Sequence, residues 1–269
     1  MQQQQVIDRW NAIIVDVLAR VDGTLADATA GSHAVIAQLG TDLGPLTQPW
    51  TAVQHQMHQY TSEISDAWNR ISDQFSAVDN LADGVMWREG GKRNRATKEV
   101  DIRYNRAWRL VMAAAADVLR QRALEADART TLCRRCGAPL DRIRLSGMAL
   151  NVECGYCQAI NTIEPGPALR MFAVTGAMYL AERQALDQWE AMTIAETQIN
   201  SYRDRKEVPL DLLREYERAG RGYWTERMTV EAEFAPELRP YVQQKIDSYM
   251  KSVNKKLRDH WQWRQLTSR

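Results

Sequence analysis

Residues that interrupt helices are scarce in this chain, which has 14 Gly and 8 Pro among 269 residues. Because Gly and Pro punctuate most turns, their scarcity predicts long helices. Phe is also rare, with 3 copies against 9 Trp and 9 Tyr, so most aromatic rings carry a polar group that suits an interface. We expect an all-α protein, large enough to bury a core without disulfides.

Long hydrophobic runs are absent as well. The N-terminal stretch MQQQQVIDRW has no basic segment followed by an apolar one, so no signal peptide is expected. The stretches AWRLVMAAAADVL and ALRMFAVTGAMYLA have 13 and 14 residues, fewer than the ~20 that span a bilayer. They predict close packing of helices. We expect a cytoplasmic protein, where close cysteine pairs favour metal binding over disulfides.

The usual catalytic motifs are missing too. The sequence contains no GxSxG, no HExxH and no glycine pattern of a phosphate-binding loop. None of the four histidines, His33, His55, His58 and His260, follows a Glu by three positions, which excludes the familiar di-iron helical site. We therefore expect no enzyme and no small-molecule substrate.

Apolar residues recur at steps of three and four positions along most of the chain. This spacing predicts six helices, at about residues 6–39, 50–80, 97–130, 167–205, 209–234 and 242–261. The third would be roughly 50 Å long, and the fourth is its natural antiparallel partner. The stretch DGVMWREGGKRNRATKEV, with Gly84, Gly90 and Gly91, predicts an exposed basic loop before the third helix.

All four cysteines lie between residues 131 and 160, in two CxxC pairs separated by 17 residues. This spacing is typical of a four-thiolate zinc site, because each pair can turn both of its sulfurs toward one ion. Gly137 would ease the backbone after the first pair. The candidate ligands of a structural zinc ion are Cys133, Cys136, Cys154 and Cys157. Two alternatives stay open: CGYC as a redox dithiol, although no βαβ pattern surrounds it, and another metal such as iron.

The segments CRRCGAPL and VECGYCQAIN, with the β-compatible stretches RIRL and MALNV between them, resemble a zinc ribbon over residues 131–165. In this arrangement RIRL and MALNV would form a hairpin that turns at Ser146 and Gly147. The resemblance implies zinc bound by each of the four cysteines. It implies no particular function, because zinc ribbons are structural modules of unrelated proteins.

Charge is distributed unevenly along the chain. Residues 1–87, 88–144 and 145–269 carry net charges of −7, +8 and 0. The basic block could contact nucleic acid, anionic lipid or the acidic first block. The candidate anion-contacting residues are Lys92, Arg93, Arg95, Arg134, Arg135, Arg142 and Arg144.

These patterns together predict an elongated bundle of long antiparallel, coiled-coil-like helices, with the zinc ribbon inserted at the tip of the hairpin formed by the third and fourth helices. The expected regions are 1–130, 131–165 and 166–269. The leading hypothesis is a non-catalytic zinc-containing scaffold or assembly protein that binds a protein partner or itself. One alternative is a nucleic-acid-binding zinc-ribbon protein that uses residues 88–144, and a third is a membrane-surface-binding helical protein.

Overall fold

The computed structural model describes residues 2–38, 43–78, 84–127, 131–140, 147–202, 208–260 and 263. Within these residues the chain is mostly helical and contains a single two-stranded sheet. The elements are α1 (Gln2–Ala37), α2 (Gly44–Ser76), α3 (Val85–Asp127), β1 (Leu150–Glu153), β2 (Ile160–Ile163), α4 (Pro167–Met171), the π-helix η1 (Phe172–Gly176), α5 (Ala177–Gln184), α6 (Leu186–Asn200), α7 (Leu210–Phe234), the 3₁₀ helix η2 (Pro236–Tyr241) and α8 (Val242–Arg258).

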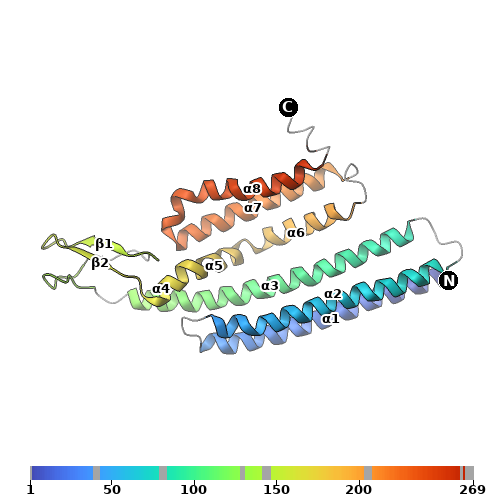
Figure 1. Cartoon of the computed structure of the whole chain (residues 1–269), viewed down its shortest axis with the longest axis horizontal. Helices are drawn as coiled ribbons and strands as arrows, with labels where there is room; N and C mark the ends of the chain where they lie inside the picture. The colour runs from blue at the N-terminus through green and yellow to red at the C-terminus, as the bar shows by residue number, and fades with distance from the viewer. Residues whose placement is uncertain are drawn as a thin grey trace.

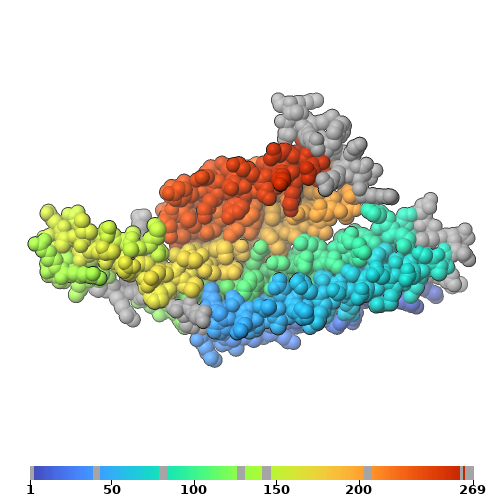
Figure 2. All heavy atoms as spheres, viewed as in Figure 1, coloured from blue at the N-terminus to red at the C-terminus, as the bar shows by residue number. Residues whose placement is uncertain are grey.

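The helices form an elongated body in which neighbouring long helices run antiparallel (Figure 1). The first three, α1, α2 and α3, pack against one another along their length, and α4 to α6 return along α3. On the other side of α5 and α6 lie α7 and α8. The cysteine-bearing segment projects from one end of the body, between α3 and α4 (Figures 1 and 2). The predicted all-α fold, with a small hairpin at a helical-hairpin tip, is confirmed.

The first three helices enclose an aromatic-rich core. Along α2 the buried Trp50 and Met57 lie two helical turns apart, and from Met57 the buried residues recur every three or four positions: Tyr60, Ile64, Trp68, Ile71 and Phe75. The ring of Trp10 from α1 is fully buried and lies 5.5 Å from that of Trp68. Fully burying one large apolar side chain contributes ~1.5–3 kcal/mol, so this apolar stripe holds the three helices together.

A second core lies between α6, α7 and α8. The apolar stripe of α8 consists of Ile246, Met250, Val253 and Leu257, all buried. On the outer part of this core, Trp224 and Tyr249 stack with ring centroids 3.8 Å apart and planes 4° from parallel. These contacts fix α8 on α7.

Residues 88–98 belong to α3, so the prediction of a basic loop there was wrong. The reason is a close approach between helices. A Cβ on Gly90 would lie 3.1 Å from a ring carbon of Trp68, and the indole N–H of Trp10 donates to the carbonyl oxygen of Glu89. A glycine inside a helix costs ~1 kcal/mol relative to Ala, but here it makes room for a buried tryptophan.

The predicted continuous helix over 167–205 is interrupted. It opens with the five residues of α4, widens into the π-helix η1, and bends again at Ala185 between α5 and α6. Phe172 is buried with its ring over Gly176, where a Cβ would lie 2.6 Å from a ring carbon. A π-bulge adds one residue to a turn, which periodicity of apolar residues does not reveal.

The Ala-rich stretches pack helix on helix, as their length predicts. Ala113, Ala115 and Ala116 of α3 are buried, and so are Ala177 and Ala181 of α5, which packs against α3. Small side chains let two helical backbones approach closely. Among the described helices, none combines the length and apolar character needed to cross a membrane.

Candidate metal centre

The fold brings the four cysteines together at the projecting end of the molecule. Their sulfur atoms all lie within 4.8 Å of one another. The Sγ atoms of Cys133 and Cys157 are 3.6 Å apart, as are those of Cys136 and Cys154. In the part of the chain that the structure describes, this is the one group of three or more His, Cys, Asp or Glu side chains placed to hold a metal ion.

Each CxxC pair forms a turn, and the two turns have equivalent backbone hydrogen bonds. In the first cysteine turn (133–136), the N–H of Gly137 donates to the carbonyl oxygen of Cys133 at 2.9 Å. In the second cysteine turn (154–157), the N–H of Gln158 donates in the same way to Cys154, also at 2.9 Å. Gly137 and Gln158 also share a left-handed backbone, with φ of 74° and 58°. The predicted role of Gly137 is confirmed, and Gln158 repeats it without the freedom of a glycine.

Backbone amides point at two of the sulfurs. The N–H groups of Cys136 and Arg135 lower the pKa of Cys133 to about 6. In the second turn, the N–H groups of Cys157 and Tyr156 lower the pKa of Cys154. Since a thiolate, not a thiol, binds a metal ion, these amides prepare both sulfurs as ligands.

The sulfur of Cys136 depends more on a cation. The pKa of Cys136 is raised to about 12: the N–H of Ala138 lowers it, but the crowded sulfur of Cys157, burial and the other two sulfurs outweigh that effect. Four sulfurs this close cannot all carry negative charge without a compensating ion. The donor set therefore fits a metal ion better than it fits four free thiols.

Asn161 on β2 ties the two halves of the site together. Its side-chain oxygen accepts from the N–H of Arg134 at 2.9 Å, and its amide nitrogen lies 3.5 Å from Sγ of Cys133. The residue is 4% exposed, so this polar group is buried with its partners. The sequence analysis missed Asn161, because alternation along INTI would place the apolar Ile160 on the inner face, whereas the structure exposes Ile160 and Thr162 and buries Asn161.

The hairpin that the structure describes is formed by a pair of strands that was not predicted. β1 pairs with β2, from Leu150 opposite Ile163 to Glu153 opposite Ile160, so that the second cysteine turn is itself the hairpin connection. The stretch MALNV thus supplies most of β1, but its partner is INTI. The stretch RIRL and Ser146 lie outside the described residues.

Gly147 lies where the cysteine-bearing segment between α3 and α4, here called the cysteine module, meets the helical body. A Cβ on this residue would lie 2.3 Å from the Cβ of Ala173 in η1. Contacts this short do not occur between real Cβ atoms, so only a glycine fits. The predicted turn glycine instead serves as a docking point for the module.

The candidate anion-contacting residues do not form one surface. Lys92, Arg93 and Arg95 lie near the start of α3, whereas Arg134 and Arg135 lie on the first cysteine turn beyond its other end. At 1.5 Å per residue, the part of α3 that separates the two groups is roughly 50 Å long. Arg142 and Arg144 lie outside the described residues.

Much of the basic charge on α3 is used inside the chain. The Lys92 ammonium lies 2.7 Å from the carboxylate of the buried Glu89. Further along the helix, the arginines pair with acidic residues of other helices: Arg103 with Asp22 at 2.7 Å, Arg106 with Glu190 at 2.5 Å and Arg109 with Glu182 at 3.2 Å. These ion pairs join α3 to α1, α6 and α5.

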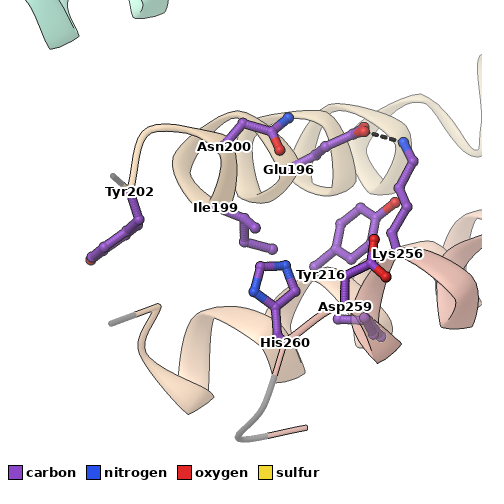
Figure 3. Close-up of a pocket in the computed structure, with 9 residues that line it drawn as sticks. Glu196, Ile199, Asn200, Tyr202, Tyr216, Lys256, Asp259 and His260 are labelled. Carbon is purple, nitrogen blue, oxygen red and sulfur yellow. Dashed lines mark hydrogen bonds and ion pairs between the residues drawn. The ribbon is translucent and has the colours of Figure 1, made fainter. Parts of the chain in front are cut away.

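A polar cavity of about 330 Å³ lies far from the cysteines, between α6, α7 and α8. Figure 3 shows Lys256 turned toward Glu196, with which it forms an ion pair, and Tyr216 beside them. Burial raises the pKa of Tyr216, and Glu196 adds to the effect. The lysine and the glutamate of this cavity thus neutralise each other.

Comparisons of the chain with family models, with curated proteins and with solved structures found no match. The four-cysteine cluster is therefore the feature that bears most directly on function.

Proposed function

We propose that this chain is a non-catalytic helical scaffold whose four cysteines hold a structural zinc ion, and that it works by contacting a partner protein. The observation that carries the proposal is the closed four-sulfur cluster at the projecting end of a long helical body. Such a site can fix the shape of an exposed module without reacting.

Zinc is the metal that this donor set favours. Four thiolates complete its tetrahedral shell and leave no position for a water molecule, which is the arrangement of structural sites. Iron also accepts four thiolates but gives a coloured, redox-active centre. In the proposed role, the zinc ion links the two cysteine turns. This link fixes the position of the residues between the cysteines of each pair.

The helical body supports a contact role in a different way. Most of its large apolar side chains are buried, and α3 directs Arg103, Arg106 and Arg109 into ion pairs with neighbouring helices. Part of the complementarity between the acidic and basic blocks is thereby used within one chain. This favours a partner protein over a second copy as the molecule that the module contacts.

Metal analysis of the full chain tests the structural part of the proposal. Elemental analysis should give one zinc per chain, and the solution should show no visible absorption from iron. Cys136→Ser and Cys154→Ser should each lose the metal, whereas Ser76→Ala, at the end of α2, should keep it. A metal-free chain with a disulfide that cycles between oxidised and reduced forms would contradict the proposal.

Affinity purification from the native cell tests the contact part. A nuclease-treated sample should retain a partner protein in fixed ratio to the chain, and the same sample from Cys154→Ser cells should lose it. Recovery of nucleic acid that disappears on nuclease treatment, with no protein in fixed ratio, would support the nucleic-acid alternative instead.

A further inference from the structure

The cysteine module exposes large apolar side chains that its own small core leaves uncovered. Tyr156 is 79% exposed, Ile160 is 73% exposed and Leu132 is 56% exposed. The apolar core of the module holds only Cys133, Leu140 and Cys154 among buried described residues. Apolar groups gathered on one small projecting unit indicate an interaction surface more strongly than the same groups scattered singly.

These side chains lie on, or next to, the two turns that carry the cysteines. The two cysteine turns lie side by side, since sulfurs from opposite turns approach to 3.6 Å. Arg135 and Tyr156 hold equivalent places in the two turns, each immediately before the second cysteine of its pair. Leu132 precedes the first turn, and Ile160 begins the strand that follows the second turn.

The same surface carries two arginines with no acidic partner among the described residues. Arg134 and Arg135 are both exposed, and neither guanidinium forms an ion pair with a residue that the structure describes. It is the backbone N–H of Arg135, not its guanidinium, that donates to Cys133. Both residues are therefore open to solvent, unlike the paired Arg103 and Arg109 of α3.

We propose that Leu132, Arg134, Arg135, Tyr156 and Ile160 form a docking surface for a partner protein segment that presents carboxylates beside apolar side chains. This inference rests on the proposed function and names the chemistry of its partner. Guanidinium groups bind carboxylates through two parallel hydrogen bonds. The exposed tyrosine, leucine and isoleucine supply the apolar anchors that such interfaces use.

The apolar groups argue against a nucleic acid at this surface. Two of the three, Leu132 and Ile160, are aliphatic and have no ring to stack on a base.

Peptide selection on the full-length, zinc-loaded protein tests the docking surface directly. The probe is a displayed library of random 12-residue peptides, and the selected peptides are then measured in solution by fluorescence anisotropy. We expect sequences enriched in Asp or Glu next to Leu, Ile, Phe or Tyr. Binding should weaken at least tenfold in Tyr156→Ser/Ile160→Ser and also in Arg134→Glu/Arg135→Glu.

The matched control is Trp87→Ser/Arg95→Glu, which removes an exposed aromatic ring and reverses an exposed arginine at the opposite end of α3. This control should bind the peptides as the unaltered chain does. Equal binding by the two double variants of the module and by the control would overturn the inference, and so would tighter binding of a single-stranded 12-nucleotide DNA than of any peptide.

Zinc content separates this inference from the proposed function. Each variant should retain one zinc per chain, because none alters a cysteine. If zinc is bound but no selected peptide depends on the tip residues, the docking surface is wrong and the zinc scaffold stands. If the unaltered chain binds no zinc, the proposed function itself fails.

Discussion

The helical body and the cysteine module solve the problem of stability by different means. In the body, two buried clusters gather rings and aliphatic chains from helices far apart in sequence, among them Trp10, Ile64 and Leu213. In the module, the buried cluster is reduced to Leu140 and two cysteines, supported by a few small side chains. A segment of this size cannot bury enough apolar surface to offset its conformational entropy. The proposed metal ion would supply what burial cannot.

Loss of the metal ion should have the largest effect, because we expect it to unfold the module and spare the body. Cys154→Ser removes a buried sulfur ligand, and metal binding contributes on the order of 10 kcal/mol to small zinc domains. We expect the module to lose its fold while the body keeps its helices. Hydrogen exchange should become fast at the amides of residues 133–138 and 154–159 with little change in far-ultraviolet circular dichroism. A loss of more than a small part of the helical signal would show that the body depends on the metal.

A core substitution should produce the opposite pattern. Ile64→Ala removes a side chain with no exposed surface from the first core, and such changes cost ~2–5 kcal/mol. The free energy of unfolding of the body should fall by that amount, as measured by urea denaturation, while zinc content stays at one per chain. The matched control is Ile160→Ala on the exposed face of the module, which should change stability by less than ~0.5 kcal/mol.

The junction between the two regions can be tested at a single contact. Gly147→Ala would force a Cβ against Ala173, and overpacking of this kind costs ~1–3 kcal/mol. The double variant Gly147→Ala/Ala173→Gly should recover stability, apart from the ~1 kcal/mol cost of a helical glycine. Thermal unfolding of the single and double variants measures the coupling; additive effects would mean that the two residues do not touch.

The smallest effect is expected from substitutions at the left-handed residue that follows each cysteine turn. Gln158 holds a positive φ that a glycine adopts without strain, so Gln158→Gly should stabilise the module by ~0.5–1 kcal/mol. The reciprocal change, Gly137→Gln, should destabilise it by a similar amount. Competition with a zinc chelator should show the two variants shifting affinity in opposite directions, by a few-fold each.

Much of the architecture could be predicted from the sequence, because it depends on local rules. The apolar residues of α2 and those of α8 recur at helical spacing, and the spacing of the four cysteines alone predicts that they form a cluster. Each of these signals lies within a few dozen residues of sequence. No knowledge of distant contacts was needed to interpret them.

What escaped prediction depends on contacts between distant parts of the chain. Gly90 looked like a loop glycine until Trp68 of another helix accounted for it. The pairing of MALNV with INTI was not predicted, because the sequence alone does not show which β-compatible stretches meet. The sequence also left open whether the arginines of α3 contact a partner or acidic residues of the same chain, and Asp22 and Glu190 on other helices account for two of them.

The two cysteine turns have the same backbone geometry, although the residues between their cysteines differ. The cysteines, the amides that point at their sulfurs and the left-handed residue after each pair define the path of the chain. The two positions inside each turn take no side-chain part in that framework: one turn presents Arg134 and Arg135, and the other Gly155 and Tyr156. Exchanging the residues at these four positions would change the surface at this end of the molecule and leave the frame of cysteines and backbone in place.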